Sequence, residues 1–574
     1  MGAFNLSPLD LGIIVAYLLG IVVYGIKKGK QKSSEDYFLG GRTMTWPIVG
    51  IALFSANISS STLVGLASDA FQTNINVYNY EWFAVVVLIF FSIFFLPFYL
   101  KSRVYTMPEF LERRYDKRSR YYFSFITIVG NVMVDTAAGL YVGSIVLKLL
   151  FPDFSSSTII IILAMAAAAY TIPGGLNSVI QTEVIQAILL IIGSCLLTYF
   201  AFDQLGAGWN GMMSKLDAML AAGEVNFGNR AEEGKFIPET ANEVFSLVRP
   251  GNDEFMPWWG LITGVPLLGF YFWANNQFMV QRVLGAKDLN HGRWGALFAG
   301  LLKLPVIFIM VVPGVLALLL FNKLDISALN YPLASGGMCN NLADCPNLTY
   351  PVLLFQLLPT GVLGLVVAGL LAAMMSSVSA TFNSASTLIT MDFIREFRPE
   401  MTSKQLVRAG QIATLTLVVL SSLWVPYIEQ VSDSLWAYLQ LVIAYTSPPV
   451  VSAFLLGLFS KRVNSHGAIV SLIVGGTAAI GMILSQAYDL FPAVNELHFL
   501  MKANLLFVLS ILTHLLVSVA TSLPDPAKVK DYTYKKELFT EETKALQLLP
   551  WYKNYRTLSL FLLVITAIVV GIFL

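Results

Sequence analysis

A single lysine interrupts the apolar run ALFAGLLKLPVIFIMVVPGVLALLLF, which covers residues 296–321. A lysine in the hydrocarbon of a membrane costs several kcal/mol on most scales. Lys303 lies about seven residues, roughly 10 Å of helix, from one end of this run, so its long side chain could reach the headgroups. The alternative is that the charge faces a hydrated site and is paired there, as intramembrane charges usually are. The spacing leaves both interpretations open.

Two other apolar segments are rich in small and hydroxyl-bearing residues. The first, FSANISSSTLVG (54–65), contains Asn57 and predicts either a close helix–helix contact or an unwound helix whose free carbonyl groups face a cavity. In the second, MMSSVSATFNSAS (374–386), helical spacing forms two adjacent polar faces, Ser376, Ser379 and Asn383 on one and Ser377, Thr381 and Ser384 on the other. Neutral oxygens can replace water around a small hard cation. Bonding of Ser and Thr to their own helix explains some of these hydroxyls without an ion.

Other polar side chains also fall in or at the ends of apolar segments. They are Glu81 in NYEWF, Asp135 in VMVDTAAGL, Glu183 in IQTEVIQAI and Gln440 in AYLQLVIAY. The segment FYFWANNQF (270–278) places Phe272 and Trp273 beside three consecutive amides. A lysine donates hydrogen bonds, a glutamate accepts them and a glutamine does both, a combination that suits the hydroxyl groups of a sugar. An aromatic ring would cover the apolar C–H face of that sugar. We therefore predict that Lys303 meets several of these groups around one hydrated pocket.

The chain that must position these residues has 574 residues, of which 56% are apolar and 12% charged. This composition is typical of an all-α polytopic membrane protein. The absence of a Gly-rich phosphate loop, a Walker lysine motif and HExxH excludes the usual signatures of ATP-driven pumps and metalloproteases, and no nucleophile–base pair indicates another enzyme. About fourteen runs are long enough to span a membrane. They lie near 10–27, 46–69, 81–100, 121–150, 157–173, 180–202, 257–281, 295–322, 352–391, 405–427, 434–460, 465–487, 498–522 and 557–574.

Basic residues are concentrated in the connections that follow odd-numbered runs. These connections include KKGKQK (27–32), the segments 101–120 and 282–293, the pair Lys461-Arg462 and the lysine-rich segment 524–556. The positive-inside rule places them in the cytoplasm and predicts that both termini are extracellular or periplasmic. Cys339 and Cys345 then share one outer loop, where they can form a disulfide.

Several motifs, in order along residues 35–550, resemble the solute:sodium symporter family and within it the sodium/glucose (galactose) cotransporters. The matching stretches are SEDYFLGGR (34–42), SANIS (55–59), YEWF (80–83), YTMPEFLERRY (105–115), IPGGLNSVIQTEVIQ (172–186), VQRVLGAK (280–287), FNSASTLITMDF (382–393) and FLLGLFSKR (454–462). Because these motifs recur in order across nearly the whole chain, the resemblance is specific.

The resemblance implies a LeuT-like, inverted-repeat transporter core of five plus five helices, broken in helices two and seven. The implied division is an extra N-terminal helix with a basic cytoplasmic loop (1–45), a first five-helix repeat (46–203), an outer loop (204–256), a second repeat (257–460, with an outer loop at 323–351), and three peripheral helices (461–574, with a cytoplasmic loop at 524–556).

Residue by residue, the resemblance also implies a sodium site. The implied ligands are the backbone carbonyls of Ser55, Ile58 and Ala373 and the hydroxyls of Ser376 and Ser377. Two-sodium members of the family have a second sodium site, formed by a hydroxyl and an aspartate. The hydroxyl matches Ser379, and the position of the aspartate is occupied here by Glu183. One or two Na⁺ ions are therefore expected as coupling ions.

The implied sugar site contains both matches and departures. Glu81, Lys303, Gln440 and Asn57 match the family, and so does Trp273 in the inner aromatic gate. At three positions the side chain differs: Phe272 lacks the tyrosine hydroxyl, Thr62 replaces His or Gln, and Asp135 replaces Asn and adds a negative charge. These differences leave the identity of the sugar open.

Together these matches imply a sodium-coupled secondary active symporter that imports a glucose- or galactose-like hexose by alternating access. It would be a multi-pass protein of the cell membrane (plasma or inner). The alternatives are a symporter for another solute, such as myo-inositol or an aminosugar, and a sugar-gated sensor that conducts sodium without coupled transport. The expected partners are the sugar, sodium and membrane lipids, with no nucleic acid and no obligate protein partner.

Overall fold

The structure is a computed structural model that describes residues 6–29, 33–151, 153–225, 234–321, 324–329, 331, 337–430 and 435–574. The remaining residues include parts of the predicted basic connection 27–32, of the predicted outer loops 204–256 and 323–351, and the first residue of the predicted run 434–460. The predictions for those residues lie outside the described part of the chain.

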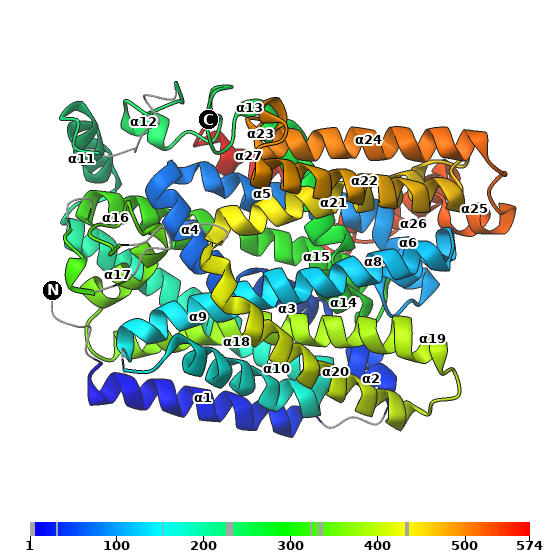
Figure 1. Ribbon diagram of the computed structural model, residues 1–574, viewed down its shortest axis with the longest axis horizontal. Coiled ribbons are helices and arrows are strands. Elements are labelled where there is room, and N and C mark those ends of the chain that lie inside the picture. The colour runs from blue at the N-terminus through cyan, green and yellow to red at the C-terminus, as the bar shows by residue number, and fades with distance from the viewer. Residues whose placement is uncertain are drawn as a thin grey trace.

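Helices make up most of the described chain, which contains no β-strand (Figure 1). The first ten helices are α1 (Pro8–Lys28), α2 (Ser34–Leu39), α3 (Trp46–Asn57), α4 (Ser60–Thr73), α5 (Asn79–Phe90), α6 (Leu96–Ser102), α7 (Met107–Arg114), α8 (Lys117–Gly130), α9 (Ala137–Leu150) and α10 (Ser156–Leu205). The next ten are α11 (Trp209–Ala221), α12 (Ala241–Val244), α13 (Trp258–Phe270), α14 (Gln277–Leu284), α15 (Leu289–Lys303), α16 (Val312–Phe321), α17 (Thr349–Leu357), α18 (Val362–Leu388), α19 (Arg395–Phe397) and α20 (Ser403–Trp424).

The chain continues through α21 (Leu435–Phe459), α22 (Ser465–Tyr488), α23 (Pro492–Asn495), α24 (Phe499–Ala520), α25 (Pro526–Tyr532), α26 (Lys536–Gln547) and α27 (Tyr555–Gly571). Short π-helical turns continue several of these helices, at Phe91–Phe95, Asn131–Thr136, Tyr271–Asn275, Ile307–Val311 and Ile389–Ile394. Such turns inside helices are frequent at functional sites, and two of these five lie at the site described below.

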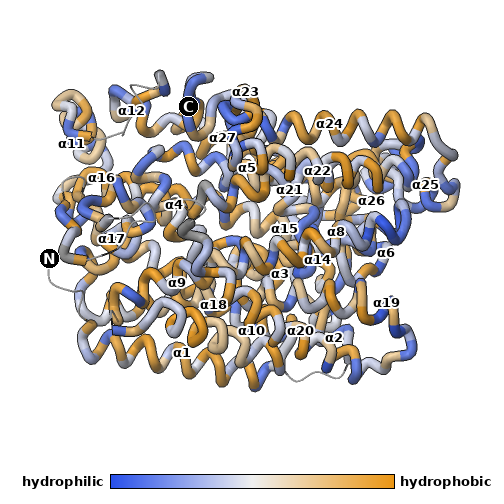
Figure 2. The backbone as a smooth tube through the Cα atoms, in the orientation of Figure 1, coloured by the Kyte–Doolittle hydropathy of each residue, from blue (hydrophilic) through white to orange (hydrophobic). Residues whose placement is uncertain are grey.

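The long helices are apolar over most of their length (Figure 2). Within the described residues, nine helices are long and apolar enough to cross a membrane, or ten if the bent pair Leu289–Lys303 and Ile307–Phe321 forms one span. Two shorter apolar helices, α3 and α27, add to these. A multi-pass membrane protein follows from this count, whereas the number fourteen stays a prediction.

The predicted breaks in helices two and seven are both present. Ile58 leaves the helical conformation between α3 and α4, and the Ser59 side chain then accepts a hydrogen bond from the Thr62 N–H to begin α4. Asn276 is extended (φ −67°, ψ 127°) and caps α14 in the same way, through the Phe278 N–H. Serine and asparagine are preferred at helix N-caps, so the local sequence itself favours a new helix at each point.

α10 contains a third interruption, at Gly175. Its backbone (φ 56°, ψ −157°) is accessible only to glycine, and a Cβ there would lie 2.4 Å from the Tyr37 carbonyl oxygen. Two predicted spans, 157–173 and 180–202, lie on either side of this point. α10 packs extensively against α18 and also against α1, and the three run side by side in Figure 1.

The predicted run 352–391 is divided in the structure. α17 ends at Leu357 and α18 begins at Val362, after Gly361 with φ 87°. The Asp10 carboxylate on α1 accepts hydrogen bonds from the Gly361 and Gly364 N–H groups, each 2.7 Å long. This contact holds α1 against the beginning of α18, since an anion is favoured at a helix N-terminus.

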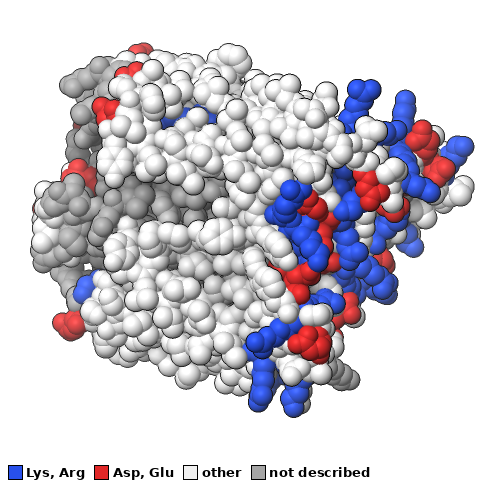
Figure 3. Space-filling model, turned by 45° about the vertical axis from the view of Figure 1, so that its right-hand side comes forward, with Lys and Arg blue, Asp and Glu red and all other residues white. Residues whose placement is uncertain are grey.

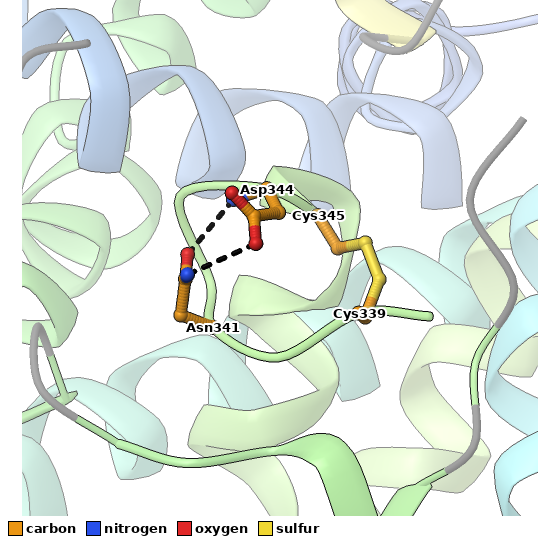
Figure 4. Close-up of a disulfide and its surroundings, with 4 residues drawn as sticks. All are labelled: Cys339, Asn341, Asp344 and Cys345. Atoms are coloured by element: carbon orange, nitrogen blue, oxygen red, sulfur yellow. Dashed lines mark hydrogen bonds between the residues drawn. A yellow bond between two sulfur atoms is a disulfide. The ribbon is translucent and has the colours of Figure 1, made fainter. Parts of the chain in front are cut away.

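Before α17 the chain forms a small loop closed by a disulfide between Cys339 and Cys345, whose Cα atoms lie 6.1 Å apart. Within this loop the Asn341 side chain accepts a hydrogen bond from the Asp344 N–H and donates one to the Asp344 carboxylate (Figure 4).

Lys and Arg side chains gather at one end of the molecule (Figure 3), the end at which α19 and α25 lie in Figure 1.

A buried carboxylate, Asp392, lies in the π-helical turn that follows α18. It accepts hydrogen bonds from Arg120 (2.9 Å), Ser124 (2.5 Å) and Thr106 (2.7 Å). These bonds join α8 and the residue that caps α7 to the end of α18.

Candidate functional site

A cavity of about 100 Å³ lies where the break between α3 and α4 meets α5, the π-helical turn Asn131–Thr136, the end of α13, α18 and α21. A volume of this size holds several water molecules. The wall contains seven of the eight residues predicted to bind sugar: Asn57, Thr62, Glu81, Asp135, Phe272, Trp273 and Gln440. Residues that are far apart in the sequence therefore converge on one space among the apolar helices.

Lys303, the eighth residue, is not part of the wall and is fully buried. Its ammonium group forms an ion pair with Glu81 and donates a hydrogen bond to the side-chain oxygen of Asn57. It also lies 5.5 Å from the centroid of the Trp273 ring. A lysine held in this way does not reach the headgroups, so the snorkelling interpretation is wrong. The charge is paired, and both of its partners line the cavity.

The break between α3 and α4 is held by hydroxyl groups. The Thr62 hydroxyl donates a 2.7 Å hydrogen bond to the Asn57 carbonyl and lies 3.1 Å from the Ser59 hydroxyl. Both Asn57 and Thr62 also face the cavity. Thr62 thus stabilises the broken helix and contributes to the wall at once.

Aromatic and amide side chains complete the wall. The Phe272 and Trp273 rings form an edge-to-face pair with centroids 5.4 Å apart, in the π-helical turn before the break in helix seven. Gln440 comes from α21. The ring faces, the amide and the Glu81 carboxylate together offer an apolar surface with hydrogen-bond donors and acceptors, as a sugar requires.

Asp135 differs from the other charged residues of the site. It lies in the π-helical turn Asn131–Thr136 and faces the cavity. No described residue forms an ion pair or hydrogen bond with its carboxylate, and no lysine or arginine is among the residues that line the cavity. Of the two carboxyl groups in the wall, Glu81 is paired with Lys303, whereas Asp135 has no cationic partner among the described residues.

The predicted sodium ligands lie on two neighbouring elements. The hydroxyl oxygens of Ser55, in α3, and Ser376, in α18, are 3.2 Å apart. Ser377 lines the cavity, and its hydroxyl donates a 3.1 Å hydrogen bond to the Met374 carbonyl. Ile58 lies at the break itself and Ala373 is buried in α18. Of this set, the Ser55 and Ser376 hydroxyls are close enough to contact one small cation together.

The two residues of the predicted second sodium site have different neighbours. The Ser379 hydroxyl donates a 2.7 Å hydrogen bond to the Tyr170 hydroxyl. Glu183 forms a fully buried ion pair with Arg282, in which the Arg282 Nε lies 3.2 Å from a carboxylate oxygen. Arg282 already neutralises this carboxylate without an ion.

Sequence reasoning missed some residues of the site. The apolar wall residues Leu268, Leu439 and Ile443 give no signal, because they resemble every other position of an apolar helix. Tyr80 also lines the cavity, and its place beside Glu81 in YEWF was a usable indication. The sequence places Arg282 in the basic connection 282–293, and no neighbouring residue indicates that its buried partner is Glu183.

A comparison with protein families gives a match over most of the chain. The model of the "Sodium:solute symporter family" matches residues 37–475, about three quarters of the sequence. The chain belongs to the sodium:solute symporter family. This symporter is similar to sodium/glucose cotransporter 1 of Mus musculus, with 34% identity over 532 residues, covering 90% of this chain and 79% of that protein. It is also similar to sodium/myo-inositol cotransporter 2 of Oryctolagus cuniculus, with 33% identity covering 92% and 79%.

Solved structures show that the symporter shares its fold with other transporters. A Na⁺-coupled sialic acid symporter in a substrate-bound outward-open state matches with a TM-score of 0.70 and 20% identity, over 90% of this chain and 99% of that one. A closed nucleobase-cation-symport-1 family transporter matches with a TM-score of 0.52 and 12% identity, over 88% and 99%. The relatives of this multi-pass membrane symporter are transporters rather than enzymes.

Proposed function

We propose that this symporter uses a sodium gradient to import a hexose such as glucose or galactose by alternating access. The observation that carries the proposal is the buried pair of Glu81 and Lys303, joined by Asn57, beside a cavity walled by Trp273 and Gln440. Fixed donors and acceptors next to an aromatic ring suit a solute with many hydroxyl groups. The similarity to sodium/glucose cotransporters supports the same substrate class.

The proposed sodium site consists of the carbonyls of Ser55, Ile58 and Ala373 with the hydroxyls of Ser376 and Ser377. The close approach of α3 and α18 supports it, since the Ser55 and Ser376 hydroxyls lie 3.2 Å apart there. The break at Ile58, which frees carbonyl groups at the end of α3, supports it as well. An ion there would join the broken helix to α18 and so bias the arrangement of the two. We propose that this is the first ion to bind, from the outside.

A second sodium ion between Ser379 and Glu183 is the weaker proposal. Such an ion would compete with Tyr170 for the serine hydroxyl and with Arg282 for the carboxylate. One ion is sufficient for uphill transport. Entry of one charge across 100 mV releases about 2.3 kcal/mol and a tenfold sodium gradient about 1.4 more, which sustains a sugar gradient of roughly 500-fold.

We further propose fourteen spans, with the repeats at 46–203 and 257–460 and both termini on the outer side. The gathering of Lys and Arg at one end of the molecule supports this orientation through the positive-inside rule (Figure 3). Epitope tags at the two termini, tested for antibody binding on intact cells, would locate both ends. Binding only after permeabilisation would reverse the orientation.

The central test is the uptake of labelled galactose or glucose into proteoliposomes that contain the purified chain. An inward sodium gradient should drive accumulation above the external concentration, and potassium in its place should not. Equal uptake in the two salts would refute coupling to sodium. A sodium current without sugar accumulation would instead favour the sensor, and competition by myo-inositol rather than by hexoses would favour the other solute.

Asp135 favours a second candidate substrate, an aminosugar. A carboxylate without a described partner in a cavity among apolar helices is costly unless a proton or a cation neutralises it. The ammonium group of an aminosugar would be such a cation, and an anionic sugar would be repelled. At neutral pH, at which the amine is already largely protonated, amino derivatives of glucose should compete with galactose better than glucose does. Asp135→Asn should abolish that preference and leave the uptake of neutral sugar intact; a preference that survives the substitution would exclude this role.

A further inference from the structure

Away from the cavity, an apolar groove of about 500 Å³ runs between α15 and α27 and begins at the first residue of α3. Its aromatic walls are Trp46, Trp294, Phe298, Tyr552 and Phe561. Trp46 packs edge-to-face against Phe298 with centroids 5.2 Å apart, yet 38% of Trp46 and 54% of Phe561 stay exposed. This surface is open to the surroundings of the protein, which at an apolar helix means lipid.

The length of the groove matches one leaflet of a bilayer. Along α27 it extends from Tyr552 and Lys553, just before the helix, to Ile565, ten residues after the first residue of α27. Ten residues of helix span about 15 Å, half of a hydrocarbon core about 30 Å thick. Trp46 begins α3, Trp294 lies in the first half of α15 and Tyr552 precedes α27, so all three lie near helix beginnings, where an interfacial aromatic belt is expected.

The beginning of the groove carries positive charge that the protein does not fully neutralise. The Glu542 carboxylate in α26 pairs with both Arg293 and Arg556. Burial alone would raise the pKa of Glu542, but hydrogen bonds from Arg293, Tyr555 and Arg556 outweigh it and lower that pKa. One ionised carboxylate thus serves two arginines. Lys553 lines the groove and is exposed, and its ammonium forms no ion pair with a described residue.

A lipid chain suits this groove better than another helix, because a helix about 10 Å wide is a rigid cylinder. A hydrocarbon chain is narrower and flexible, and fits between aromatic walls. The unneutralised lysine at the interfacial end then selects a negatively charged headgroup.

We propose that this groove binds an anionic phospholipid, with an acyl chain against Phe298, Leu301 and Phe561 and the headgroup phosphate at Lys553. The bound lipid would bridge α15, which supplies Lys303 to the transport site, and the peripheral helix α27. The proposal concerns a lipid site and does not depend on which solute is transported.

Native mass spectrometry of the delipidated full-length protein, titrated with phosphatidylglycerol and phosphatidylcholine, tests this proposal. We expect one phosphatidylglycerol molecule to bind about fivefold more tightly than phosphatidylcholine, the equivalent of the roughly 1 kcal/mol that one lysine contributes near a membrane surface. Lys553→Gln should remove the difference between the two lipids. Leu301→Trp, at a position that is 42% exposed, should fill the groove and remove the tight site for both.

Two matched variants control for charge and bulk elsewhere on the surface. Lys461→Gln removes an exposed lysine between α21 and α22, and Leu415→Trp enlarges a half-exposed residue of α20. Neither should change lipid binding. Equal binding of the two lipids, or equal binding by the groove and control variants, would mean an annular lipid only and overturn the proposal. Dimers that Leu301→Trp dissociates would assign the groove to a second copy of the chain instead.

Discussion

The ion pair between Glu81 and Lys303 predicts a strong coupling between two substitutions. Lys303→Met keeps the length of the side chain and removes its charge, and Glu81→Gln keeps the shape and removes the opposite charge. In either single variant one ion is left buried without its partner. In the double variant neither ion remains, so the two substitutions together should cost far less than the sum of their separate effects.

The magnitude follows from the burial of the pair. The side chains of Lys303 and Glu81 are 0% and 4% exposed, so little solvent can screen a charge that loses its partner. Removing one member of a buried ion pair costs about 3–5 kcal/mol, whereas replacing both members is often close to neutral. The coupling energy in a double-mutant cycle should therefore be about 3 kcal/mol or more in unfolding free energy.

Two measurements on the same four proteins test this reasoning. Unfolding in mixed micelles gives the stability of each protein, and proteoliposome uptake gives the transport of labelled hexose. We expect stability to return in the double variant while uptake stays lost in all three. If the loss of stability in the double variant equals the sum of the losses in the two single variants, the buried ion pair between Glu81 and Lys303 is refuted. Recovered uptake in the double variant would show that the sugar does not depend on these charges.

Three further predictions concern the elements around the site. Ser377→Ala should raise the sodium concentration for half-maximal uptake by about tenfold, the effect of one lost ligand oxygen, with hexose affinity at saturating sodium unchanged; an unaltered sodium requirement would exclude this ligand. Asp10→Ala removes the acceptor of two N–H groups at the beginning of α18, and should lower the unfolding free energy by about 2–4 kcal/mol in micelles. Gly175→Ala would force a Cβ to within 2.4 Å of the Tyr37 carbonyl oxygen and should cost about 3 kcal/mol, while Gly20→Ala, whose Cβ would meet nothing within 4 Å, should be neutral in the same unfolding assay.

Much of the candidate site could be predicted because polar residues are conspicuous in an apolar sequence. Lys303 stood out in its run, and Glu81 was correctly named as a candidate partner. The expectation that several of the polar groups meet the lysine is only partly right. Gln440 and Asp135 face the cavity without bonding to the described ammonium group, and Asn57 supplies the second contact instead. Which of several polar groups meets a given charge depends on helix packing, which spacing along the chain does not specify.

The fold shows the same division between local and distant information. The breaks at Ile58 and Asn276 follow from residues that cap helices, and the division before α18 could have been found from Pro359 and Gly361, which the long apolar run concealed. The pairing of Glu183 with Arg282 could not be found, because the two residues are 99 positions apart. Each separately resembles an ordinary polar residue near a helix end.

Main-chain oxygens at the break between α3 and α4 persist under every side-chain substitution. A cation held there would keep two of its five proposed ligand oxygens, the carbonyls of Ser55 and Ile58, however the sequence of the segment drifts, provided that the break itself is retained. Variation in ion affinity among descendants of this chain would then be confined to the hydroxyls of Ser376 and Ser377. Loss of ion dependence would require a continuous helix through residues 58 and 59.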